Sequence, residues 1–157
     1  MPLPTKKPSG KITVLVTDDS PTYRKSLCML LKLDERIEIV GQAGSGREGV
    51  KKALALQPDV ILMDIAMPLL NGLDAAEQIL VANPAAKVIM LTVHDDDAYI
   101  ERAIVLGAVG FLTKQTADTK LADAICEGAN GKILFSPAIM KRMAAAFKKR
   151  RLAATAA

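Results

Sequence analysis

The feature that most constrains the fold is a repeated pair of segments: a short, continuously apolar run, then a stretch with helical spacing. The apolar runs lie at 12–17, 37–40, 60–63, 87–92 and 109–113. They are apolar at consecutive positions rather than at every second one, which is typical of strands buried on both faces. The predicted helices lie at 22–33, 45–56, 73–82, 96–106 and 116–128. This alternation predicts a doubly wound α/β domain whose five-stranded parallel sheet has the order 2-1-3-4-5.

Local signals mark several boundaries. Ser20-Pro21 begins the first helix, and Ser45 with Glu48 forms a capping box at the second. Gly41 is expected to close the second strand, and Asn71-Gly72 to lie in the loop before the third helix. The aspartates at 95–97 are interpreted as the N-terminal cap of the fourth helix rather than as a second metal cluster.

Both ends of the chain differ from its centre. Residues 1–10 contain three Pro, one Gly and two Lys, and are expected to form a flexible leader. Residues 11–130 form the predicted domain, and residues 131–157 form a basic, partly helical extension. A helix is expected there from Pro137 to about Arg151, with Ile139, Met143 and Phe147 on one face.

The charge of the chain is divided in the same way. The formal net charge is +4, but between Ile12 and Met140 there are 12 basic and 17 acidic residues, a net of −5. The basic pI is therefore no argument for a nucleic-acid-binding core, and the basic tail is interpreted as a solvated linker. With no Trp and only five aromatic residues, modules that stack on bases are disfavoured as well.

Several other protein classes are also disfavoured. Cys28 and Cys126 show no metal-ligand spacing and are expected to be inert buried thiols, and His94 is the only histidine. The N-terminus lacks the apolar segment of a secretory signal, and no apolar run approaches the ~20 residues of a membrane span. These features predict a cytoplasmic protein.

Polar side chains follow four of the predicted strands. Asp18 and Asp19 follow the first strand, Asp64 the third, Thr92 ends the fourth, and Lys114 comes just after the fifth. Because the carboxyl ends of parallel strands meet at one edge of a sheet, these five side chains are expected to converge.

This set of side chains suits phosphoryl transfer. Three close carboxylates repel one another unless a cation joins them, and an all-oxygen ligand set favours Mg²⁺, with Mn²⁺ as the alternative. Lys114 adds a positive charge and Thr92 a hydroxyl, both able to bind phosphoryl oxygens, while one carboxylate can act as the nucleophile.

In these residues the sequence resembles the receiver domain of two-component response regulators. The matching segments are Asp18-Asp19, LMDIAMP around Asp64, IMLTVH around Thr92, and GFLTK with Phe111 and Lys114. The resemblance covers roughly residues 11–130 and implies a flavodoxin-like, CheY-like (βα)5 fold. AGSGREGV, GAVGFLTK and GKILFSP resemble the NarL/FixJ type in particular.

The resemblance implies a role for each matching acidic residue. Asp64 is the expected phosphoacceptor, with a histidine kinase or a phosphotransfer protein as the donor. Asp19, Asp64 and the backbone carbonyl of Ala66 are the expected Mg²⁺ ligands, and Asp18 would act mainly through bound water.

The resemblance also implies the switch. Lys114 would pair with the phosphoryl oxygens, Thr92 would move inward to bond one of them, and the rotamer of Phe111 would follow. Such a domain is a phosphoacceptor signalling domain rather than an enzyme, with Mg²⁺-dependent phosphotransfer and autodephosphorylation. Ala66 offers no side chain to hold an attacking water, so the lifetime of the aspartyl phosphate stays open.

The output stays open too. NarL/FixJ-type regulators usually carry a helix-turn-helix DNA-binding domain of about 60 residues, whereas 27 residues follow Asn130. The sequence therefore allows a stand-alone receiver acting on a protein partner or the excised receiver of a transcription factor, with direct nucleic-acid binding by this chain disfavoured. A phosphorylation-dependent homodimer is a further hypothesis, and neither the cognate kinase nor the signal is indicated.

Two alternatives differ in class. A Mg²⁺-dependent aspartyl-phosphate hydrolase would carry a second Asp two residues after its nucleophile, where this chain has Ala66. A purely structural interaction module with a dead site is disfavoured by the complete set of acidic residues, Thr92 and Lys114.

Overall fold

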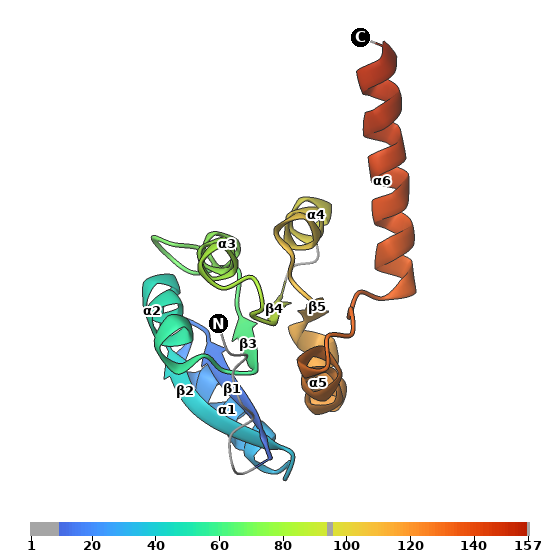
Figure 1. Cartoon of the computed structure of the whole chain (residues 1–157). Helices are drawn as coiled ribbons and strands as arrows, with labels where there is room; N and C mark the ends of the chain where they lie inside the picture. Colours follow the sequence, from blue (N-terminus) through green and yellow to red (C-terminus); the bar gives the residue numbers. More distant parts are fainter. Residues whose placement is uncertain (1–9, 94–95, 157) are drawn as a thin grey trace.

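The computed structural model describes residues 10–93 and 96–156, so the expected leader, His94 and Asp95 lie outside the described residues. In the described part, five strands and six helices follow one another along the chain (Figure 1). The strands are β1 (Ile12–Thr17), β2 (Ile37–Ala43), β3 (Val60–Met63), β4 (Val88–Thr92) and β5 (Gly110–Thr113). The helices are α1 (Pro21–Lys32), α2 (Gly46–Leu56), α3 (Gly72–Ala82), α4 (Asp97–Leu106), α5 (Lys114–Ala129) and α6 (Pro137–Ala156).

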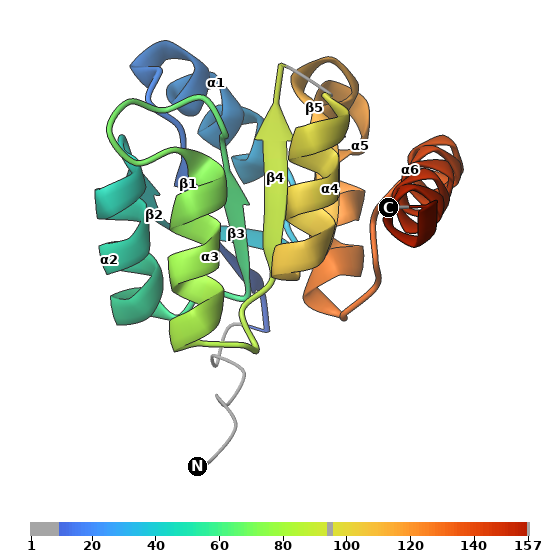
Figure 2. The same ribbon diagram turned by 90° about the horizontal axis from the view of Figure 1, so that it is seen from above.

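All the strand pairs are parallel, and the order β2-β1-β3-β4-β5 confirms the predicted topology. Helices α1 and α5 cover one face of the sheet, and α2, α3 and α4 cover the other (Figure 2). Successive residues of β1 face opposite sides: Val14 and Val16 pack toward α1 and α5, whereas Leu15 packs toward α2 and α3. Apolar side chains are thus needed at consecutive positions, which accounts for the continuous apolar runs.

The expectation that Gly41 closes the second strand was wrong, because β2 continues to Ala43. The pairing with β1 shifts between Val14↔Ile39 and Leu15↔Gly41, so β2 holds one extra residue there. A side chain at position 41 would have its Cβ 2.9 Å from Leu56 Cδ1. This glycine therefore makes room for the side chain of Leu56 rather than ending the strand.

The helix starts follow local chemistry. Ser20 and Ser45 accept hydrogen bonds through their side chains at the starts of α1 and α2, as expected. Helix α5 begins at Lys114, two residues earlier than predicted, which places this lysine in the first helical turn. At the start of α4, Asp96 is the N-cap residue without a side-chain cap bond, and Asp97 lies in the first turn.

The predicted C-terminal helix is present and extends to Ala156. Before it, Leu134 forms a parallel bridge with Gly110 at the outer edge of β5. Helix α6 lies beside α4 and projects away from the sheet, beyond the helices that cover it (Figure 1), and Figure 2 shows α6 nearly end-on. Met143 is 1% exposed, and two ion pairs, Arg142–Asp97 and Arg150–Glu101, join the helices. In the part of the chain that the structure describes, no helix has the length and apolar character needed to cross a bilayer.

Candidate functional site

The carboxyl ends of β1 and β3 bring three aspartates together. The two strands pair up to Thr17↔Met63, so Asp18 and Asp64 are the next residues on neighbouring strands. The Asp64 amide donates to the carbonyl oxygen of Thr17 at 3.0 Å, which continues the ladder past the last pair. One carboxylate oxygen from each of Asp18, Asp19 and Asp64 lies within 4.8 Å of the others. The predicted acidic cluster is therefore formed by the sheet register itself.

Asp18 is held by protein donors on both carboxylate oxygens. Its Oδ1 accepts from the backbone amide of Ser20 at 2.8 Å, and its Oδ2 accepts from Lys114 Nζ at 2.7 Å. Its backbone carbonyl oxygen accepts from Arg24 Nη1 at 2.6 Å. Asp18 and Asp64 are buried, whereas Asp19 is exposed. The three carboxylates thus differ in accessibility and in the partners that fix them.

Lys114 reaches into the cluster from the first turn of α5. Its Nζ lies 3.6 Å from Asp64 Oδ2 in addition to its shorter contact with Asp18, and its side chain is 15% exposed. The ring of Tyr23 on α1 lies under the same ammonium, with its centroid 4.1 Å from Nζ. The cation is therefore surrounded by two carboxylates and one aromatic face.

Sequence reasoning missed the contributions of Tyr23 and Arg24. Both lie in the first turn of the helix that begins after Ser20. A helical turn brings its third and fourth residues back toward the point where the helix began. The positions of Tyr23 and Arg24, five and six residues after Asp18, could therefore have predicted that they lie beside it.

The electrostatics of Asp64 differ from those of an ordinary aspartate. Burial, with repulsion from Asp18 and Asp19, raises its pKa to about 6, and Lys114 only partly opposes the shift. Three carboxylates against one ammonium leave an excess of negative charge in a largely buried site.

The residues fit a hard divalent cation. The ligand atoms on offer are all carboxylate oxygens, the type that Mg²⁺ prefers, and Asp19 is accessible from solvent. A divalent ion would also offset the charge that Lys114 leaves uncompensated.

The loop after Asp64 closes tightly over the end of β3. The amide of Gly72 donates to the carbonyl oxygen of Ile65 at 2.9 Å, and a Cβ at this glycine would lie 1.7 Å from the carbonyl oxygen of Asp64. Asn71 caps α3 by accepting from the amide of Asp74 at 2.9 Å. Ala66 is exposed in this loop, and metal ligation by its carbonyl stays a prediction.

Thr92 and Phe111 lie on the adjacent strands. Thr92 ends β4, is fully buried, and pairs in register with Thr113, the residue before Lys114. It therefore lies on the same sheet edge as the aspartates. Phe111 lies lower on β5, opposite Met90, and is 2% exposed.

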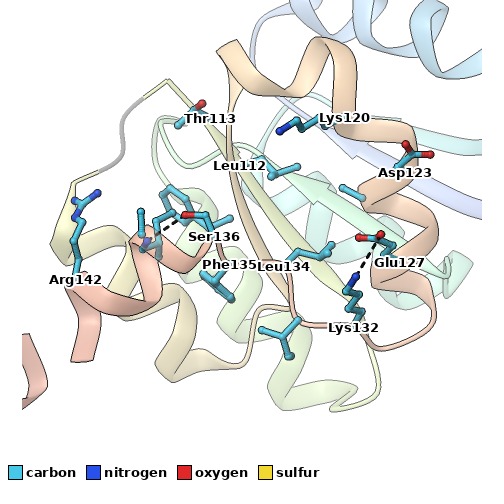
Figure 3. Close-up of a pocket in the computed structure, with 15 residues that line it drawn as sticks. Leu112, Thr113, Lys120, Asp123, Glu127, Lys132, Leu134, Phe135, Ser136 and Arg142 are labelled. Atoms are coloured by element: carbon cyan, nitrogen blue, oxygen red, sulfur yellow. Dashed lines mark hydrogen bonds and ion pairs between the residues drawn. The ribbon is translucent and has the colours of Figure 1, made fainter. Parts of the chain in front are cut away.

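Phe111 also borders a cavity that contains none of the three aspartates. The cavity has a volume of about 750 Å³ and lies between α5 and the segment that leads into α6 (Figure 3). Its apolar walls include Leu112, Leu134 and Phe135, and Lys132 pairs with Glu127 at its rim, Nζ to Oε1 3.5 Å. The acidic cluster and this cavity are thus separate features of the domain.

Comparison with known proteins gives a consistent result. The family model described as "Response regulator receiver domain" matches residues 14–126. The transcriptional regulatory protein LnrK of Bacillus subtilis is 34% identical over 138 residues, which cover 88% of this chain and 63% of LnrK. The response regulator GacA of Pseudomonas viridiflava is 38% identical over 133 residues, which cover 85% of this chain and 62% of GacA. The chain thus spans about three fifths of the length of these curated relatives.

Solved structures agree with the sequence comparison. The signal receiver domain of the putative response regulator NarL from Mycobacterium tuberculosis is 31% identical, with a TM-score of 0.74 over 78% of this chain and 98% of that one. The response regulator domain of Thermotoga maritima CheB is 35% identical, with a TM-score of 0.72 over 76% of this chain and 97% of that one.

Proposed function

This chain belongs to the response regulator receiver domain family, and we propose that it accepts a phosphoryl group on Asp64 and thereby switches the surface that it presents to an output. Receiver domains are signalling domains of two-component systems rather than classical enzymes. The observation that carries the proposal is the position of Asp64 within the cluster of Asp18, Asp19 and Lys114.

Asp64 is the best placed nucleophile of the three aspartates. Asp18 has one oxygen bound to the Ser20 amide and the other to Lys114 Nζ, so attack through either oxygen would break a short contact. Asp19 is exposed, where water competes with any phosphoryl donor. Asp64 is buried beside the ammonium, and burial together with repulsion from Asp18 and Asp19 raises its pKa, an effect that a bound cation would offset.

The proposed reaction transfers a phosphoryl group from a phosphohistidine. A carboxylate oxygen of Asp64 bonds to phosphorus while the phosphorus–nitrogen bond of the donor breaks, and the electron pair leaves with the histidine, which takes up a proton. Asp19, Asp64 and the carbonyl oxygen of Ala66 would hold Mg²⁺, which would neutralise part of the charge on the phosphoryl group. Lys114 and Thr92 donate to the phosphoryl oxygens.

The switch acts through the neighbouring strands. Thr92 and Phe111 lie on β4 and β5, and a phosphoryl group at Asp64 that draws in Thr92 would favour one packing of α4, β5 and α5. The partners are then a histidine kinase or phosphotransfer protein as donor and a cytoplasmic output downstream. The name of LnrK, a transcriptional regulatory protein, favours control of transcription as the output, through a DNA-binding domain or a protein partner. Dimerisation on phosphorylation is part of the same proposal.

The test is a phosphorylation assay on the purified chain. Incubation with Mg²⁺ and either acetyl phosphate or a phosphorylated histidine phosphotransfer domain should add one phosphoryl group, measured by intact mass. Asp64→Asn should abolish the label. Asp123→Asn, which removes an exposed carboxylate on α5, is the matched control and should be labelled normally. An unlabelled wild type, or full labelling of Asp64→Asn, would overturn the proposal.

A further inference from the structure

We propose that Tyr23 is a positioning residue for Lys114: its ring holds the ammonium beside Asp64 so that it meets the incoming phosphoryl group. This inference rests on the proposed function, because it concerns the same site. It assigns a role to a side chain outside the set of residues proposed to bind the phosphoryl group and the metal.

The chain fixes the ring of Tyr23 through the start of α1. Ser20 accepts from the Tyr23 amide at 3.2 Å, and Pro21 occupies the first helical turn. Tyr23 is half-buried and packs against the apolar cluster between α1, α5 and the sheet. A residue held at both its backbone and its ring offers a stationary surface to its neighbour.

The contact with Lys114 has the geometry of a cation–π interaction. The 4.1 Å separation between Nζ and the ring centroid is well inside the ~6 Å at which the ring face attracts a cation. The lysine side chain is only 15% exposed, so water weakens the attraction little.

The ring of Tyr23 attracts the Lys114 ammonium as a third carboxylate would, but it leaves more of the N–H donors free. An ammonium has three N–H donors, and Asp18 takes one of them at 2.7 Å. An aromatic face attracts the charge without accepting a strong hydrogen bond, so N–H groups stay available for phosphoryl oxygens. A carboxylate in its place would bind a second donor and add to the repulsion on Asp64.

Restriction of Lys114 is the expected benefit. Lysine carries its charge on a flexible four-carbon stem. The ring closes the α1 side of the site, and an ammonium that cannot withdraw in that direction spends more time beside Asp64. Loss of the ring should therefore slow phosphorylation while the protein stays folded.

The experiment compares Tyr23→Leu with Tyr23→Phe, which keeps the aromatic face. The readout is the apparent second-order rate constant for labelling of Asp64 by acetyl phosphate with Mg²⁺. We expect Tyr23→Leu to be labelled about fivefold more slowly than wild type, which corresponds to a loss of about 1 kcal/mol. Tyr23→Phe should stay within about twofold of the wild-type rate. Tyr99→Leu on α4, where the tyrosine is 36% exposed, is the matched control and should leave the rate unchanged.

A double-mutant cycle separates positioning from packing. In a Lys114→Met background, Tyr23→Leu should cause no further loss of rate, because the cation that the ring holds is gone. NMR of the unphosphorylated protein adds a readout without activity: the Lys114 Hε protons should be shifted upfield by the ring in wild type and Tyr23→Phe, and not in Tyr23→Leu. If Tyr23→Leu does not fold, Tyr23→Met replaces it.

The outcomes are distinguishable. A wild type that takes no label overturns the proposed function, and the positioning role with it. A labelled wild type whose leucine or methionine variant keeps the full rate overturns the positioning role alone. The positioning role is likewise overturned if the loss of rate is equally large in the Lys114→Met background.

Discussion

Lys114 contacts Asp18 more closely than Asp64: its Nζ lies 2.7 Å from Asp18 Oδ2 and 3.6 Å from Asp64 Oδ2. The ammonium therefore compensates the aspartate that is not the proposed phosphoacceptor. Burial of Asp64 and repulsion from its two neighbouring carboxylates are therefore only partly offset, and together they raise its pKa to about 6. This imbalance makes the unphosphorylated site sensitive to pH and to cations.

The first prediction is a pH dependence of stability that originates in Asp64. Its pKa is raised from 3.8 to about 6, so between these values the folded protein binds more protons than the unfolded chain. The free energy of unfolding contributed by this group therefore falls as pH rises through that window. Asp64→Asn should remove the fall and stabilise the protein at neutral pH by on the order of 2 kcal/mol. Urea unfolding at about pH 4 and about pH 7 measures both effects.

The matched control is Asp123→Asn, whose carboxylate is exposed on α5. It should keep the wild-type pH dependence. An Asp64→Asn variant less stable than wild type at neutral pH would show that burial and repulsion do not dominate at this carboxylate.

The second prediction concerns divalent cations. Mg²⁺ should raise the melting temperature of the wild type, because an ion bound only by the folded state stabilises it by about 1.4 kcal/mol at tenfold excess over Kd. EDTA should reverse the shift. Asp19→Asn, which removes the accessible carboxylate of the cluster, should weaken it strongly. An equal Mg²⁺ shift in this variant would place the binding site elsewhere.

The sequence allowed the sheet order and the convergence of the acidic cluster to be predicted, because both depend on periodicity and on where strands end. It did not reveal the extra residue in β2, nor the close approach of Leu56 to Gly41 just after it. Nor did it show that Lys114 would contact Asp18 and the ring of Tyr23. Those contacts depend on side-chain directions at the start of two helices. Helical spacing places Tyr23 near the end of β1, but it does not show which group its ring meets.

The third prediction is that Gly72→Ala disrupts the phosphoacceptor segment. The added Cβ would lie 1.7 Å from the carbonyl oxygen of Asp64, so the backbone after β3 must move. We expect a loss of about 3 kcal/mol or more in the free energy of unfolding and a failure to label Asp64. Gly128→Ala on α5 is the control: its Cβ would meet the ends of apolar side chains at 3.2 Å or more. Wild-type labelling in Gly72→Ala would contradict the role given to this close approach.

The fourth prediction concerns the docking of α6 on α4. Met143 is 1% exposed, whereas Arg142 and Asp97 form their ion pair at the surface, with side chains 43% and 62% exposed. Burial of a methionine outweighs a surface ion pair, which contributes about 0–1 kcal/mol. Met143→Ala should therefore release α6, seen as faster hydrogen exchange of its amides and faster trypsin cleavage at 148–151. Arg142→Gln should change both rates little.

Met140→Ala is the matched control, because this methionine lies one turn earlier on α6 and is 45% exposed. Its exchange and cleavage rates should stay close to those of the wild type. Added salt also distinguishes the two kinds of contact. Salt screens surface ion pairs and weakens them, whereas it does not weaken the burial of apolar side chains. If moderate salt or Arg142→Gln released α6 as fully as Met143→Ala, the helix would be held by charge. Asp97 and Glu101 on α4 would then be its main contacts.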